Sequence, residues 1–159
     1  MLRQNIIIPN EKGSGQKKLA AALFAPKKRG EKMIIGIGTD IFDVKRLSET
    51  AISEGDPFLL RAFTEKERAQ GDAQSRRHEF FAGRFSAKEA VYKSISACKI
   101  EFRPGEIEII DDENGKPCSK LLGKTKEAFE AAFGTDYVIH ISISHETEIV
   151  SAFAVTEKL

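Results

Sequence analysis

The stretch RFSAKEAVYKS, from Arg84 to Ser94, lies inside the longest helical pattern of the chain. That pattern runs from Arg77 to about Ala97, contains no proline, and repeats its apolar residues at helical spacing. The remaining segments are shorter and mostly strand-like. The pattern therefore predicts a long central helix against which the rest of the fold packs.

The same stretch places one carboxylate, Glu89, among the cations Arg84, Lys88 and Lys93. Glu89 and Lys93 are one helical turn apart, which predicts an ordinary salt bridge worth about 0.2–0.5 kcal/mol. Aromatic residues share the face of Glu89, which favours a second interpretation: Glu89 holds Mg²⁺ while the cations meet phosphates. Lys88 lies about 100° around the helix from Glu89, which assigns it to the solvated surface or to a subunit contact.

Upstream of this helix, MIIGIGTDIFD opens with the residues of a buried strand that begins at Met33. A helix is predicted to follow, with Asp43 as its N-cap and with Val44, Leu47 and Ala51 at helical spacing. A Gly-Asp-Pro break and a short helical or irregular piece come next. Thr64 and Glu67 then form a capping box that opens a helix reaching about residue 71.

Downstream, residues 106–122 alternate as two strands around a turn at Asn114-Gly115, which predicts a hairpin. A helix from Leu122 to Phe133 should end at Gly134. YVIHISISH alternates cleanly, with isoleucines on one face and polar residues on the other, and it should pair with EIVSAFAVTEK across a turn at residues 145–147. This order of elements predicts the α+β class, with a largely antiparallel sheet packed with the long central helix.

Composition describes an ordinary globular protein of 159 residues with 41% hydrophobic and 31% charged residues. Residues 1–32 hold eight Lys or Arg and two acidic residues, so with a whole-chain charge of +1 the remaining residues 33–159 carry −5. We interpret 1–32 as a disordered basic extension, with a tail for RNA or an anionic surface as the alternative, and 33–159 as one domain. An acidic domain argues against a nucleic-acid partner.

Neither a membrane span nor a signal peptide is predicted. Cys98 and Cys118 lack the spacing of a zinc site or a disulfide framework, which fits a reducing cytoplasm.

Two motifs outside the central helix carry polar residues at strand ends. GIGTDI has Ile41 where a dinucleotide fingerprint needs its third glycine, so its glycines are expected to let another segment approach the strand. Asp40 is then either a plain turn or capping residue, or a carboxylate paired with a metal, an arginine or a helix N-terminus. Ser144-His145 has no nucleophile elbow around it, which favours hydrogen bonds to a ligand or turn over a hydrolytic pair.

Three segments taken together resemble the signature blocks of holo-(acyl-carrier-protein) synthases, in the 4′-phosphopantetheinyl transferase superfamily. They are GIGTDIFDVKRL (36–47), FFAGRFSAKEAVYKS (80–94) and HISISHETEIVSAFAV (140–155). The resemblance covers residues 33–159. It implies Mg²⁺-dependent transfer of the phosphopantetheine arm of coenzyme A to a serine of acyl carrier protein, in fatty acid biosynthesis. It also implies a homotrimer with sites between subunits.

Residue by residue, the resemblance implies that Asp40 and Glu89 hold magnesium and that Lys93 lies near the phosphates. Arg46 would pair with the acidic carrier protein, and Ser86 stands where the family usually has Ala. The residues that the resemblance assigns to coenzyme A are Arg84, Lys93, Gly115, Lys116, Pro117, Ser144 and His145. The base that takes the serine proton is not assigned: Asp40, Glu89 and a metal-bound water all qualify.

Overall fold

A computed structural model describes residues 32–47 and 52–159 of the chain. The predicted extension 1–32 lies outside these ranges except for its last residue. The elements, in chain order, are β1 (Met33–Asp43), η1 (Val44–Arg46), α2 (Pro57–Ala62), α3 (Glu65–Asp72), α4 (Arg77–Ser94), η3 (Ser96–Cys98), η4 (Pro104–Glu106), β2 (Ile107–Asp111), β3 (Pro117–Leu121), α5 (Gly123–Phe133), β4 (Tyr137–Glu146) and β5 (Ile149–Lys158).

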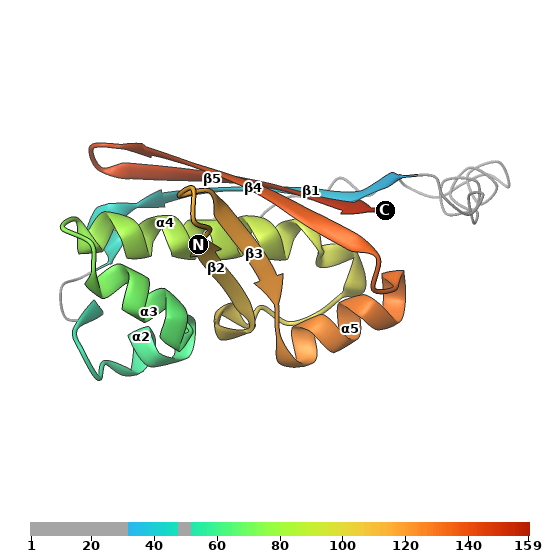
Figure 1. The fold of residues 1–159 in the computed structure, drawn as a ribbon, viewed down its shortest axis with the longest axis horizontal. Coiled ribbons are helices and arrows are strands. Elements are labelled where there is room, and N and C mark those ends of the chain that lie inside the picture. The colour runs from blue at the N-terminus through green and yellow to red at the C-terminus, as the bar shows by residue number, and fades with distance from the viewer. Residues whose placement is uncertain (1–31, 48–51) are drawn as a thin grey trace, which may run out of the picture. The chain divides into compact units, whose positions relative to one another are not determined.

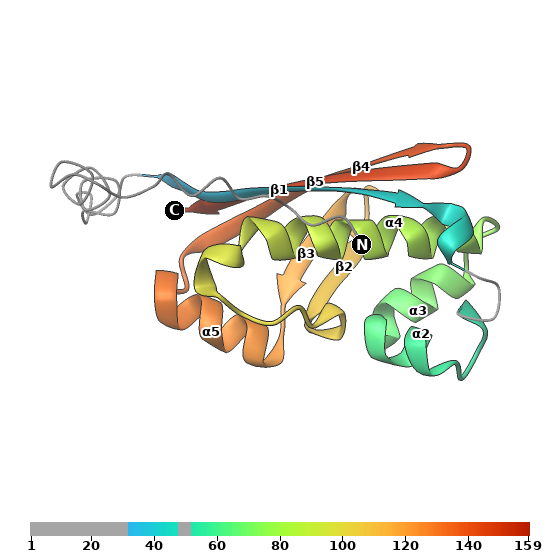
Figure 2. The same ribbon diagram turned by 180° about the vertical axis from the view of Figure 1, so that it is seen from behind.

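Helix α4 is the central element, as its sequence pattern predicts. It packs along one face of a three-stranded antiparallel sheet with the strand order β1-β5-β4 (Figure 1). The hairpin β2-β3 forms a second, separate antiparallel sheet. Figure 2 shows α2 and α3 near the start of α4 and α5 near its end. The predicted α+β class with an antiparallel sheet and a central helix is confirmed, although the strands divide into two sheets.

Strand β1 approaches α4 so closely that glycine is needed on its inner face. A Cβ atom added at Gly38 would lie 1.9 Å from the carbonyl oxygen of Ala90, and one at Gly36 would lie 2.1 Å from that of Ser94. Both neighbours are helix backbone, which cannot move aside as a side chain would. The two glycines therefore admit another segment, as expected, and they bring the next inward residue, Asp40, against α4.

Buried apolar side chains form two clusters along α4. One joins the second half of α4 to the hairpin, α5 and the sheet. The other surrounds the start of α4 and includes the rings of Phe63 and Phe81, whose centroids are 4.8 Å apart. The predicted alternation of β4 holds, because Ile139, Ile141 and Ile143 pack on these clusters while the polar residues between them are exposed. None of the helices in the described ranges combines the length and apolarity needed to cross a bilayer.

Local signals placed most element ends correctly. Thr64 caps α3 through a complete capping box, with bonds to and from Glu67. Asp56 caps α2 by accepting a 2.7 Å hydrogen bond from the amide of Phe58. The hairpin turn contains Gly115 at φ 76°, and α5 ends at Gly134 at φ 84°. These turns need the left-handed region of backbone space, where glycine carries no steric cost.

Two boundary predictions were wrong. Asp43 does cap a turn, since its carboxylate accepts from the amide of Lys45 at 2.9 Å, but that turn is a 3-10 helix ending at Arg46. Leu47 is already extended, and Ala51 lies outside the described residues. In the last hairpin Glu146 pairs with Ile149, so β4 continues through residues 145 and 146 and the turn is formed by residues 147 and 148.

Candidate active site

Asp40 projects from the inner face of β1 onto α4. Its carboxylate accepts a 3.0 Å hydrogen bond from the hydroxyl of Ser86 and lies 2.9 Å from the ammonium of Lys93. Lys93 also donates to the carbonyl of Thr39 at 2.9 Å. The interpretation of Asp40 as a plain turn or capping residue is therefore wrong: Asp40 lies within β1, and two side chains of α4 bond its carboxylate.

Glu89 lies beside this group on the same side of α4 and is half-buried. Burial raises the pKa of its carboxyl, the nearby charge of Asp40 raises it further, and Lys93 and Arg46 oppose that rise. Two carboxylates near enough to repel each other suit a hard cation, and Mg²⁺ prefers oxygen donors and takes few of them from the protein. No third His, Cys, Asp or Glu joins the pair within the described residues, which leaves coordination positions for water or phosphate.

The salt bridge expected between Glu89 and Lys93 is replaced by another. In the described part of the chain, the ammonium of Lys93 pairs with Asp40 across the strand–helix interface instead of with Glu89 on its own helix. Glu89 stands at the i,i+4 spacing, yet the side chain of Lys93 bonds the carboxylate on the strand. Lys93 thus ties β1 to α4 and leaves Glu89 as an acid with a neighbouring carboxylate.

A pocket of about 490 Å³ lies at the opposite edge of the sheet, near the start of α4. Four of the residues assigned to coenzyme A line it: Arg84, Gly115, Pro117 and His145. The guanidinium of Arg84 forms an ion pair with Asp111 and stacks 4.4 Å from the ring centroid of Phe80. Its Nε is buried and has no hydrogen-bond partner in the part of the chain that the structure describes, and burial lowers the pKa of the group. An anion entering this pocket would meet a positioned cation.

His145 reaches this pocket because Gly83 makes room for it. A Cβ atom at Gly83 would lie 2.7 Å from Nε2 of His145 and 3.5 Å from Ile143. Ser144 is exposed on the other face of β4, since neighbouring strand residues point to opposite faces. The two residues of the motif therefore do not form a nucleophile–base pair, and the structure brings only His145 into the pocket.

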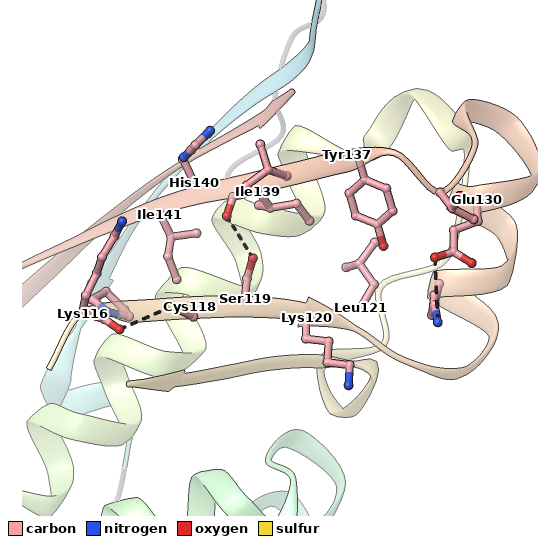
Figure 3. A pocket seen from close by; sticks show the side chains of 14 residues that line it. Lys116, Cys118, Ser119, Lys120, Leu121, Glu130, Tyr137, Ile139, His140 and Ile141 are labelled. Atoms are coloured by element: carbon pink, nitrogen blue, oxygen red, sulfur yellow. Dashed lines mark hydrogen bonds and ion pairs between the residues drawn. The ribbon is translucent and has the colours of Figure 1, made fainter. Parts of the chain in front are cut away.

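Lys116 lies in a second pocket, of about 690 Å³, which is lined mainly by residues of β3 and β4. Figure 3 shows this pocket between β3 and β4, with Lys116 at one end and Tyr137 and Glu130 at the other. Pro117 lines both pockets. Gly115, Lys116 and Pro117 are thus adjacent at the tip of the hairpin, but Gly115 lines the smaller pocket and Lys116 the larger one.

Within one chain the two halves of the predicted site are apart. Asp40 belongs to β1 and His145 to β4, and these are the two edges of a sheet with β5 between them. Asp40, Glu89 and Lys93 do not line the pocket that holds Arg84 and His145. One chain therefore presents two separate groups of candidate residues, called half-sites below: Asp40, Glu89 and Lys93 form one, and Arg84 and His145 form the other.

The remaining predicted residues have different fates. Arg46 is exposed at the end of η1, with its guanidinium 5.2 Å from the ring centroid of Phe42, and it lies near enough to lower the pKa of Glu89. The assignment of Lys88 to the solvated surface or a subunit contact was wrong. Its side chain is 0% exposed and pairs at 2.8 Å with Glu67, which is equally buried.

Comparison with known proteins agrees with this fold and this arrangement of residues. A family model described as the 4′-phosphopantetheinyl transferase superfamily matches residues 36–142. The chain belongs to this superfamily.

Its relatives narrow the comparison further. The chain is 42% identical over 125 residues to a holo-[acyl-carrier-protein] synthase of Clostridium novyi, covering 79% of this chain and 88% of the relative. A coenzyme A complex of the synthase from Chronobacterium ammoniagenes superposes with a TM-score of 0.68 at 26% identity, covering 78% of this chain and 97% of the other. The holo-ACP synthase of Plasmodium yoelii superposes with a TM-score of 0.67 at 31% identity, covering 81% and 98%.

Three residues at the candidate site were not assigned a role from sequence. Ser86 holds the carboxylate of Asp40, Asp111 pairs with Arg84, and Gly83 admits His145. Each acts on a residue far away in the sequence: the separation is 46 positions for Ser86, 27 for Asp111 and 62 for Gly83. The one signal available was Ser86 itself, because it stands where the family usually has Ala.

Replacing Gly83 by Ala should impair the pocket while sparing the fold. Alanine favours a helix interior over glycine by about 1 kcal/mol, so the melting temperature should hold or rise. The added methyl must displace the ring of His145, which is the end of a movable side chain. We expect calorimetric titration to show at least about tenfold weaker binding of adenosine 3′,5′-bisphosphate. Unchanged affinity would show that the position of His145 is immaterial to that ligand.

Proposed function

We propose that this chain transfers the 4′-phosphopantetheine group of coenzyme A to a serine of apo acyl carrier protein, in the cytoplasm and in the service of fatty acid biosynthesis. The observation that carries the proposal is the convergence of Asp40, Glu89 and Lys93 from β1 and α4. The superfamily match and the coenzyme A complex of a relative support it.

The reaction follows from the bonds exchanged. The serine oxygen forms a bond to the β-phosphorus of coenzyme A, the bond from that phosphorus to the bridging oxygen breaks, and adenosine 3′,5′-bisphosphate leaves. The serine proton must pass to a base, for which Asp40, Glu89 and a water held by either remain candidates. Such a transfer asks the protein chiefly for positioning and for neutralisation of phosphate charge.

Magnesium would be held by Asp40 and Glu89, whose carboxylates offer the oxygen donors it prefers. When bound, the ion neutralises charge on the pyrophosphate. Lys93 supplies a second positive charge at the same place and keeps Asp40 oriented. In the other half-site, Arg84 and His145 are suited to a phosphate, and the loop of Gly115, Lys116 and Pro117 would pack on the adenine end.

The decisive experiment is incubation of the full chain with apo acyl carrier protein, coenzyme A and Mg²⁺, read by the intact mass of the carrier. The proposal expects the carrier to gain the mass of one phosphopantetheine, and expects chelation of Mg²⁺ to prevent the gain. A carrier protein whose acceptor serine is replaced by alanine is the control. No gain in mass under any condition would refute the transferase assignment.

Recognition of the acidic carrier would begin at Arg46. Its guanidinium is exposed beside the half-site that contains Glu89, and Lys45 is its neighbour on η1. The net charge of the domain is negative, so long-range attraction of an acidic protein would be weak and a local basic patch must act instead.

We further propose that the working form is a homotrimer with each site between two subunits. The half-sites of one chain lie on opposite edges of its sheet, so a second copy can complete each. On the outer face of that sheet, β1 and β5 carry an apolar patch available to such a copy, since four large side chains there are about half exposed or more: Ile37 57%, Ile41 69%, Ile149 50% and Phe153 46%.

Complementation tests this assembly. Glu89→Gln and His145→Ala trimers should each be inactive alone, because every site contains one damaged half. Co-expressed in equal amounts, they should recover about a quarter of wild-type activity, since random assembly pairs two intact halves at about one site in four. Light scattering should give three chain masses. If mixing restores nothing although mixed trimers form, both half-sites must come from the same chain.

A further inference from the structure

The outer edge of β2 is bonded by side chains of α3 and α4, and we propose that Gln70, Glu67 and Lys88 are positioning residues that hold the β2-β3 hairpin in place for the nucleotide end of coenzyme A. None of the three lines the pocket. They would act through the hairpin, which carries Asp111, Gly115 and Pro117 into it. This inference rests on the proposed function for its ligand.

Among the strands of the described ranges, β2 pairs with β3 alone, along one of its edges. The amide of Leu122 donates to the carbonyl of Glu106, and the amide of Asp112 donates to the carbonyl of Lys116. The backbone amides and carbonyls of the even-numbered residues of β2 therefore point toward β3. The amides and carbonyls of Ile107, Ile109 and Asp111 therefore face away from it. Left unpaired next to the core, each such group would cost free energy comparable to a lost hydrogen bond.

Side chains from the two helices bond four of these six groups in sequence along the strand. Lys88 donates to the carbonyl of Ile107, and Glu67 accepts from the amide of Ile109 at 2.9 Å. Gln70 accepts from the amide of Asp111 at 3.0 Å and donates to its carbonyl at 3.1 Å. Three side chains thus take the place of a missing neighbouring strand.

The first two contacts are buried and coupled to each other. The side chains of Lys88 and Glu67 are both 0% exposed, and the ammonium of Lys88 also donates to the carbonyl of Pro104 at 2.8 Å. Glu67 also accepts from the amide of Thr64 at 2.7 Å. Removing one partner would leave the other as an unpaired buried charge and would strongly destabilise the fold. Substitutions there would report folding and positioning together.

Gln70 is the contact at which positioning separates from folding. It is uncharged and partly exposed, and it holds Asp111, the last residue of β2. The carboxylate of Asp111 pairs with Arg84, and Asp111, Gly115 and Pro117 all line the pocket with His145. Releasing the backbone of Asp111 therefore frees the hairpin tip and the guanidinium together, while the core beneath stays packed.

Gln70→Ala in the full chain tests this. The expected result is about tenfold weaker binding of adenosine 3′,5′-bisphosphate by calorimetric titration. The KM for coenzyme A should rise similarly while kcat stays within about twofold. Hydrogen exchange should accelerate at the amide of Asp111. Arg68→Ala is the matched control, since Arg68 also donates from α3 to a backbone carbonyl, that of Phe63, and none of its hydrogen bonds among the described residues goes to β2.

The outcomes separate this inference from the proposed function. Weaker nucleotide binding and faster exchange in Gln70→Ala, with Arg68→Ala like wild type, support positioning even if the wild type transfers nothing to a carrier. Unchanged nucleotide affinity in Gln70→Ala overturns the inference, whether or not the wild type is an active transferase. An equal loss of affinity in Arg68→Ala also overturns it, because the effect would then be a general weakening of α3.

Discussion

Glu89→Gln is expected to lower Mg²⁺-dependent transfer by about a hundredfold to a thousandfold, the size of loss seen when one preorganised hydrogen-bond donor at a reacting centre is removed. Glutamine keeps the size of the side chain but removes the negative charge that, with Asp40, would hold the ion. One carboxylate would remain beside Lys93, which already pairs with it. The measurement is the rate of mass gain of the carrier at saturating coenzyme A and Mg²⁺.

Stability should not account for this loss. Burial and the charge of Asp40 raise the pKa of Glu89 in the folded chain, so above that pKa the ionised carboxylate opposes folding. A neutral glutamine removes this cost, and the melting temperature near neutral pH should therefore hold or increase. Glu127→Gln, on an exposed position of α5, is the matched control for loss of one acidic charge. Near-normal transfer by Glu89→Gln would contradict the role of Glu89 as a magnesium ligand and would leave it as an ordinary residue of the helix surface.

Local signals predicted the elements because each depends on nearby residues. The capping box at Thr64, the glycine after α5 and the alternation of β4 all act over a few positions. The prediction of a helix after Asp43 was wrong because, at this point of the chain, a contact with distant residues outweighs the local pattern. Val44 and Leu47 have helical spacing, but Leu47 is buried in the cluster around Phe63, and the chain turns extended to place it there.

The candidate site was predictable as a set of residues and not as a geometry. Asp40, Glu89 and Lys93 were grouped by resemblance, and the structure brings them together. The separation of this group from His145 depends on strand order, which the sequence does not display. The burial of Lys88 could not be foreseen from its helical angle, because it depends on Glu67 and on carbonyls of another segment arriving at the same point.

Gly38→Ala should produce the largest loss of stability, about 3 kcal/mol or more by analogy with overpacked cores. The new Cβ would lie 1.9 Å from the carbonyl oxygen of Ala90 and 2.8 Å from the amide nitrogen of Ser94. Both belong to helix backbone, so β1 and α4 must move apart along their whole contact. Chemical denaturation at matched protein concentration measures the loss.

Gly55→Ala separates this overlap from backbone strain. Gly55 has φ 81°, and no atom of residues 32–47 or 52–159 lies within 4 Å of an added Cβ, so its substitution should cost only about 1–2 kcal/mol, the penalty of the left-handed conformation. Activity should distinguish the two variants as well. Asp40 follows Gly38 on the same face of β1, so a displaced strand carries this carboxylate away from Ser86 and Lys93. Gly38→Ala should therefore lose transfer even at temperatures where it remains folded, whereas Gly55→Ala should retain it. Equal stability of Gly38→Ala and the wild type would mean that β1 and α4 are farther apart than the glycines indicate.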